Sequence, residues 1–215
     1  MSIDVLQAIA QAQASWQPPQ VPEDIPQGDM PGDKVWIGPQ SIEKANVAFR
    51  AALPMLQEAL KANPAHKAVI AVTGGSGVMK TCVSALFTYY LKELGIGAYT
   101  LSGDNYPWRI PVQNDAERMR IFRMGGVEGM LAQGVYNPEN AAILKELQLA
   151  DLDSEPKKQE EYPWLAAYQS AGREALSGYL GTELEQNYAK LESVLAQFKA
   201  GQEKIWLRRL GNEDT

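Results

Sequence analysis

This 215-residue sequence contains only one cysteine and only one histidine, two residue types that often form disulfide bonds and metal sites. A single thiol, Cys82, excludes an intramolecular disulfide and is typical of proteins in the reducing cytoplasm, where we expect this one. His66 stands alone before a short apolar run, and nothing near it suggests a set of metal ligands.

The sequence also has fewer basic than acidic residues: 20 Lys and Arg against 26 Asp and Glu, which gives a net charge of −6. Broad nucleic-acid binding needs a basic face, so we expect no nucleic-acid partner. No apolar run is long enough to cross a bilayer, and Asp4 and Gln7 interrupt the first apolar stretch, where a signal peptide would need its core. We therefore expect no membrane partner.

The most informative stretch lies between residues 71 and 81 and reads Ala-Val-Thr-Gly-Gly-Ser-Gly-Val-Met-Lys-Thr. It follows the phosphate-binding pattern G-x-x-x-x-G-K-[ST], except that Met79 stands where the second glycine is expected. The residues predicted to hold nucleotide phosphates are Gly74, Gly75, Ser76, Gly77, Val78, Met79, Lys80 and Thr81.

The chemistry of phosphate binding explains this combination of residues. Glycines allow a tight turn that directs several backbone N–H groups at one anion, at the positive end of the following helix. Lys80 adds a mobile charge, and the Thr81 hydroxyl can ligate Mg²⁺. Met79 either crowds the phosphates or, being flexible, swings aside. A glycine-rich turn without a ligand is the alternative, but an apolar run at 67–72 and a helical pattern at 81–94 favour the loop.

A second polar loop, Ser102 to Arg109, follows the apolar segment 98–101. If both apolar segments are parallel strands, their carboxyl ends meet at one edge of the sheet, where ligands bind. Asp104 could then accept a proton from an attacking hydroxyl or help to hold Mg²⁺. Arg109 could pair with an anionic substrate. An ordinary turn is the alternative interpretation of this loop.

Together the 73–81 and 101–106 segments resemble the uridine kinase, phosphoribulokinase and pantothenate kinase group of phosphate-loop kinases. They are also similar to bacterial proteins described as adenylylsulfate-kinase-like. The resemblance implies that Asp104 faces the acceptor hydroxyl as a base or metal-linked carboxylate, and that Tyr106 lines the acceptor pocket. The sequence differs from the group at Met79, and it lacks a recognisable later metal site, base-binding loop and arginine-bearing lid.

The predicted fold class is α/β, a phosphate-loop parallel sheet with a large helical C-terminal part. A strand at 67–72, the loop, a helix and a strand at 98–101 make a βαβ unit. Residues 1–33 are predicted to form a helix and a proline-rich arm, residues 34–110 the α/β core, and residues 111–215 helices packed on it as one domain.

Within the helical part, Asn137-Pro138 predicts a helix start, because asparagine caps helices and proline suits the first turn. Gly125-Gly126 predicts a break in the preceding helix. A complete sheet of this kind needs about five strands, and only two are convincing. The sheet is therefore either unusually small, or the chain is the front part of a longer protein.

Two functions follow from these patterns. The first is an ATP-dependent, Mg²⁺-requiring kinase that phosphorylates a hydroxyl of a small metabolite, with Lys80 and Asp104 as catalytic residues and Thr81 and Asp104 at the metal. Tyr106 and Arg109 would contact the substrate. The alternative is a non-catalytic nucleotide-binding or protein-interaction module with a degenerate loop. The expected partners are a nucleotide and a small molecule, and a homo-oligomer is compatible with the sequence.

Overall fold

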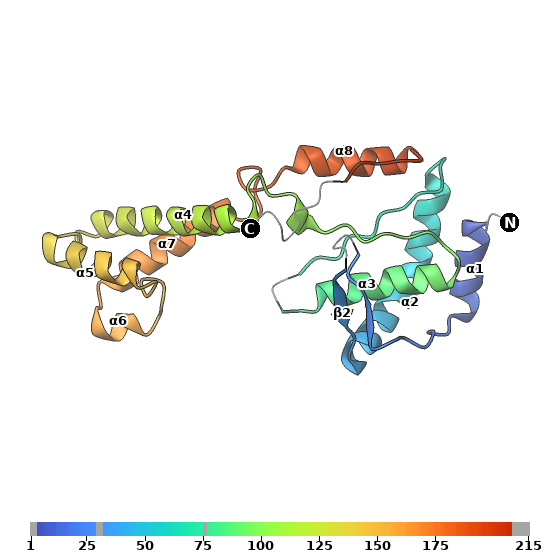
Figure 1. Cartoon of the computed structure of the whole chain (residues 1–215), viewed down its shortest axis with the longest axis horizontal. Helices are drawn as coiled ribbons and strands as arrows, with labels where there is room; N and C mark the ends of the chain where they lie inside the picture. The colour runs from blue at the N-terminus through green and yellow to red at the C-terminus, as the bar shows by residue number, and fades with distance from the viewer. Residues whose placement is uncertain (1–3, 29–31, 75–76, 208–215) are drawn as a thin grey trace. The chain divides into compact units, whose positions relative to one another are not determined.

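The computed structural model describes residues 4–28, 32–74 and 77–207. By its internal contacts the chain divides into two compact units, whose α-helices are labelled in Figure 1. Unit 1 comprises residues 1–106 and 189–211, and unit 2 comprises residues 107–188 and 212–215. The three-part division at residues 33 and 110 stays a prediction.

Unit 1 is built mainly from helices that begin at recognisable caps. The Asp4 carboxylate accepts a hydrogen bond of 3.0 Å from Leu6 N and starts α1, whereas Pro39 occupies the first turn of α2, where its missing N–H costs nothing. The elements of unit 1 are α1 (Val5–Ser15), β1 (Asp24–Pro26), β2 (Lys34–Trp36), α2 (Pro39–Ala62), α3 (Lys80–Glu93), the 3₁₀ turn η1 (Gly103–Asn105) and α8 (Tyr188–Lys199).

An aromatic cluster holds the helices of unit 1 together. The ring of Phe49 on α2 lies 4.6 Å from Trp16, 5.2 Å from Phe87 and 5.3 Å from Tyr90, measured between ring centroids. Tyr90 is fully buried on α3, and burial raises the pKa of its hydroxyl to about 12. This packing anchors the middle of α3 and so fixes where its N-terminal end lies within unit 1.

The predicted parallel sheet is wrong. The described residues form a single two-stranded sheet, in which β1 and β2 pair antiparallel with Ile25 opposite Val35. Residues 67–72 and 98–101, predicted as parallel strands, belong to no strand, and the side chains of Val69 and Tyr99 are exposed. An apolar run shows that a segment can be a strand, but a strand exists only when a neighbour satisfies its backbone groups.

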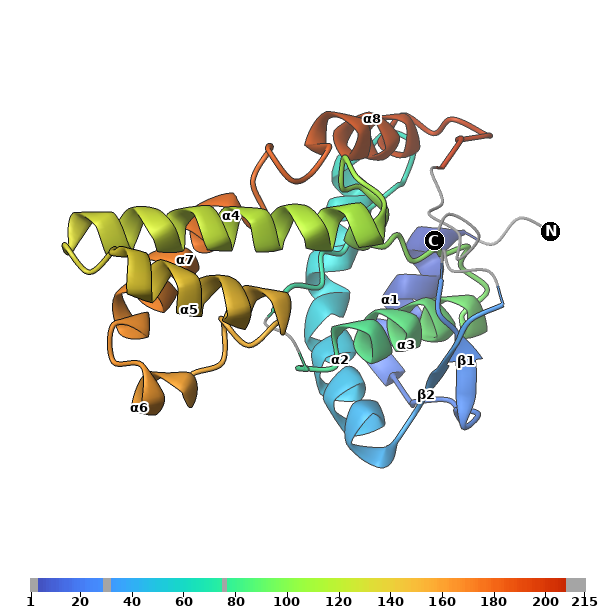
Figure 2. The ribbon, with the colours of Figure 1, turned by 60° about the vertical axis from the view of Figure 1, so that its left-hand side comes forward.

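Unit 2 is a helical body whose two long helices, α4 and α7, lie side by side, as Figure 2 shows. The predicted break at Gly125-Gly126 is wrong, because α4 is continuous there and both glycines are buried. A Cβ added at Gly125 would collide with Ala175 of α7, so the absent side chain allows the two helices to approach closely. The helices of unit 2 are α4 (Pro111–Ala132), α5 (Pro138–Leu149), α6 (Lys158–Glu161) and α7 (Leu165–Tyr179).

A buried carboxylate organises the start of unit 2. Glu185 is 1% exposed and accepts hydrogen bonds from Arg118 Nε at 2.6 Å, Asn114 Nδ2 at 3.2 Å and Gly181 N at 2.7 Å. Burial favours the neutral acid, but these three donors outweigh it and lower the pKa of Glu185. The Glu185 backbone carbonyl in turn accepts from Trp108 N at 2.9 Å. The segment that follows Tyr106 is thereby held to unit 2.

None of the helices in the described ranges is long and apolar enough to cross a membrane.

Candidate phosphate-binding loop

The backbone of the 74–81 loop turns through left-handed conformations at three described positions. Gly74 has φ of 153°, Gly77 has φ of 77°, and Met79 has φ of 68° with ψ of 26°. A Cβ at Gly74 would lie 2.9 Å from Val78 Cγ2, so this position needs glycine for space as well as for conformation. Gly75 and Ser76, two of the predicted phosphate contacts, lie outside the described residues.

Met79 occupies a backbone conformation that suits glycine, and its side chain turns away along α2. Its thioether sulfur lies 3.6 Å from Ser41 Oγ and 3.9 Å from Lys44 Nζ. The side chain therefore packs on the first turns of α2, and the cost of the left-handed backbone remains. Of the two sequence-based alternatives for Met79, this arrangement corresponds to the side chain that swings aside.

The loop runs directly into the N-terminal turn of α3. Helix α3 begins at Lys80, as predicted to within one residue, and Thr81 is exposed in its first turn. The first N–H groups of a helix have no carbonyl one turn earlier to bond, so they can be offered to an anion. Cys82 Sγ lies 3.8 Å from the carbonyl oxygen of Trp36, which ties the same turn to β2.

The segment after α3 runs back along this helix toward its N-terminal end. The chain reverses where Ile96 N donates to Leu91 O at 2.8 Å. The Thr100 hydroxyl then lies 2.7 Å from the Thr88 hydroxyl and 3.4 Å from the carbonyl oxygen of Ser84, one turn nearer the start of α3. Figure 1 shows this returning strip of chain beside α3, ending in η1.

Asp104 and Tyr106 differ in exposure at the end of this segment. Asp104 is exposed in η1, where its backbone N–H donates to Ser102 Oγ at 3.3 Å. Among the described residues, none makes a hydrogen bond or ion pair with the Asp104 carboxylate. Tyr106 is 1% exposed, so its ring belongs to the packed interior.

Arg109 lies in unit 2, and its guanidinium group has partners there. Its Nη1 donates to the Tyr179 hydroxyl at 3.1 Å, and its Nη2 lies 3.6 Å from Glu117 Oε1. Of the predicted residues, 77–81 thus lie together at the start of α3, whereas Arg109 belongs to a separate network.

Lys44 and Ser41 are neighbours of the loop that the sequence analysis missed. They precede Met79 by 35 and 38 residues, and no local motif connects the two segments. Only the packing of α2 against α3 brings them together, so a sequence pattern could not have identified them.

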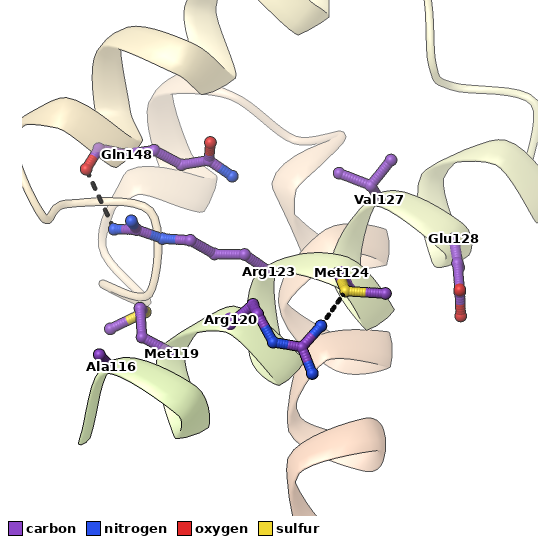
Figure 3. A pocket seen from close by; sticks show the side chains of 8 residues that line it. All are labelled: Ala116, Met119, Arg120, Arg123, Met124, Val127, Glu128 and Gln148. Carbon is purple, nitrogen blue, oxygen red and sulfur yellow. Dashed lines mark hydrogen bonds between the residues drawn. The ribbon is translucent and has the colours of Figure 1, made fainter. Parts of the chain in front are cut away.

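A cavity of about 710 Å³ lies in unit 2, between α4 and α5 (Figure 3). Its two arginines are already engaged. Arg120 forms a bidentate pair with Glu117 at 2.7 and 2.8 Å, and Arg123 bonds Asp153 at 3.1 Å and the Gln148 carbonyl at 3.0 Å. Arg123 therefore joins α4 to the end of α5 and the segment after it, whereas Arg120 pairs within α4, and neither side chain is part of the loop described above.

Comparison with known proteins gives one informative similarity. No protein-family model matches the chain, and no solved structure matches it. The chain is 32% identical over 152 residues to a bifunctional alpha-galactosidase/sucrose kinase, AgaSK, of Mediterraneibacter gnavus. The matched residues are 71% of this chain but 11% of that relative, so the chain resembles a small segment of a much longer protein.

Proposed function

We propose that residues 74–81 bind the phosphates of ATP and that the chain takes part in phosphoryl transfer to a hydroxyl of a small metabolite. The observation that carries the proposal is the left-handed backbone of Gly74 and Gly77 shortly before the positive end of α3 at Lys80. The sucrose kinase named in the relative is consistent with this chemistry.

The relative combines two activities, and the residues of this chain favour the kinase. A glycosidase of the common type needs two carboxylates that flank the scissile bond. A kinase needs an anion cradle, a cation and an acceptor-side carboxylate, which the loop, Lys80 and Asp104 can supply. Because the relative is named for sucrose, a sugar hydroxyl is the first acceptor to test.

The proposed mechanism gives Asp104 two roles, at the metal and as the base, and gives each other residue one. The loop N–H groups and Lys80 hold the phosphates, and the exposed oxygens of Thr81 and Asp104 are of the hard type that Mg²⁺ prefers. Bound Mg²⁺ would offset the negative charge of the phosphates. Asp104 accepts the proton of the attacking hydroxyl, and buried Tyr106 supports the loop that carries Asp104.

ATP titration in the presence of Mg²⁺ tests the phosphate site directly. We expect Lys80→Ala to weaken ATP binding by at least tenfold, because a charged phosphate contact is lost. Lys92→Ala is the matched control, since Lys92 lies in the last turn of the same helix, away from the loop. If Lys80→Ala and Lys92→Ala both bind ATP as the unchanged protein does, the phosphate site is refuted. Transfer of ³²P from ATP to sucrose and to other sugars then tests the reaction.

One observation supports a second candidate, a nucleotide-binding or interaction module without catalysis. Met79 has a left-handed backbone conformation at the position where the phosphate-binding pattern has its second glycine. Met79→Gly separates the two functions. A gain in ATP affinity or turnover indicates a kinase loop weakened by the methionine, whereas unchanged nucleotide behaviour together with tight binding of a protein partner supports the module.

A further inference from the structure

Lys44 of α2 reaches the phosphate-binding loop from a different helix. Its ammonium nitrogen lies 3.9 Å from the sulfur of Met79, the residue immediately before Lys80. This approach depends on the left-handed backbone of Met79, which directs the thioether onto the first turns of α2. The residue that precedes Lys80 therefore has the ammonium group of an α2 lysine beside its side chain.

In the described part of the chain, Lys44 lacks the acidic partner that Lys34 and Lys61 of unit 1 have. Lys34 pairs with Asp24 at 2.8 Å, and Lys61 of the same helix pairs with Glu58 at 3.1 Å. For Lys44, no carboxylate among the described residues lies within 4.0 Å of the ammonium. An ammonium group beside an anion-binding turn, with no acid to neutralise it, raises the local positive potential.

We propose that Lys44 is a second phosphate-binding residue of the 74–81 loop and that it selects polyphosphates over monophosphates. The inference rests on the proposed function and extends it. A nucleoside triphosphate spreads its charge over three phosphates, so two lysines that approach from different helices can contact different groups. A monophosphate has a single phosphate group, and the loop N–H groups and Lys80 are sufficient to bind it.

Titrations with ATP, AMP and inorganic pyrophosphate test this role. We expect Lys44→Ala to weaken binding of ATP and pyrophosphate by about three- to tenfold, the range for a charged contact at an exposed site. Binding of AMP should change less than twofold. Lys44→Arg keeps the charge and should restore most of the ATP affinity, and Lys61→Ala is the control from the same helix.

The outcomes separate this inference from the function on which it rests. If Lys80→Ala loses ATP while Lys44→Ala binds ATP and pyrophosphate normally, the role of Lys44 is refuted and the phosphate loop stands. Equal losses for ATP and AMP in Lys44→Ala would also refute the polyphosphate selectivity. If Lys80→Ala binds ATP normally, the loop itself is refuted.

Acetylation of the unchanged protein provides a measurement that does not depend on folding of a variant. Lys44 is exposed and should react with acetic anhydride in the free protein. ATP should slow its acetylation several-fold while Lys61 reacts at the same rate, as read by mass spectrometry of peptides. Equal rates at Lys44 with and without saturating ATP would overturn the proposal.

Discussion

Replacing Met79 by glycine and, separately, by alanine tests the backbone geometry on which the loop depends. Both changes remove the thioether from its contacts with Ser41, at 3.6 Å, and Lys44, at 3.9 Å. The lost packing is therefore common to the two variants. The difference between their free energies of unfolding isolates the effect of a Cβ at φ of 68° and ψ of 26°.

The expected difference follows from two opposing terms. A residue with a Cβ is less stable in the left-handed conformation by about 1–2 kcal/mol. Glycine has more freedom in the unfolded chain, which disfavours its folded state by about 0.4–1 kcal/mol. The Met79→Gly variant should therefore be more stable than Met79→Ala by about 0.8 kcal/mol, the middle of a range of about 0–1.6 kcal/mol. In a helix interior the order is reversed, and alanine is favoured by about 1 kcal/mol.

Urea unfolding followed by circular dichroism and tryptophan fluorescence measures this difference, provided that the two variants share one m-value. The same substitutions at Lys92, in the last turn of α3, are the control and should show alanine as the more stable variant. If Met79→Ala proves as stable as Met79→Gly or more so, Met79 does not hold the left-handed conformation, and the proposed strain in the loop is refuted.

Two further predictions concern unit 2. Gly172→Ala should destabilise the protein by about 1–3 kcal/mol in urea unfolding, because the added Cβ would lie 2.7 Å from the backbone oxygen of Phe122. Gly178→Ala in the same helix meets nothing within 4 Å and should be neutral or stabilising by up to about 1 kcal/mol, so equal effects at both sites would contradict the packing. Glu185→Gln should cost about 2 kcal/mol, since it removes the charge that receives the Arg118 bond. Because the folded pKa of Glu185 is lowered, the unfolded state binds more protons as pH falls below the ordinary value of 4.5, and stability is lost there. Glu185→Gln should show less of this acid-induced loss in thermal unfolding at pH 3–6, and an unchanged acid dependence would contradict the assignment.

Helix positions were predictable where the signals are local. The helix predicted within residues 1–33 and the helix start predicted at Asn137-Pro138 are present in the structure as α1 and α5. The helix after the loop is present as α3. In each case the information lies within a few residues, because a helix satisfies its own backbone groups.

The strands and the helix break were not predictable from the same kind of signal. The run at 67–72 has strand composition, but no neighbouring strand pairs with it in the described structure. Gly125-Gly126 suggests a break when α4 is considered alone, whereas contact with α7 gives these glycines a packing role. Both errors arise because the deciding partner is distant in sequence.

The sequence alone determined the glycine turn, Lys80 and the helix that follows them, because a tight turn and a helix start depend on adjacent residues. Only the tertiary structure decided that Met79 lies against α2 and that Lys44 borders the same turn. Those contacts require two helices to pack through an apolar core, and the identity of the facing side chains is set by that packing rather than by any local pattern.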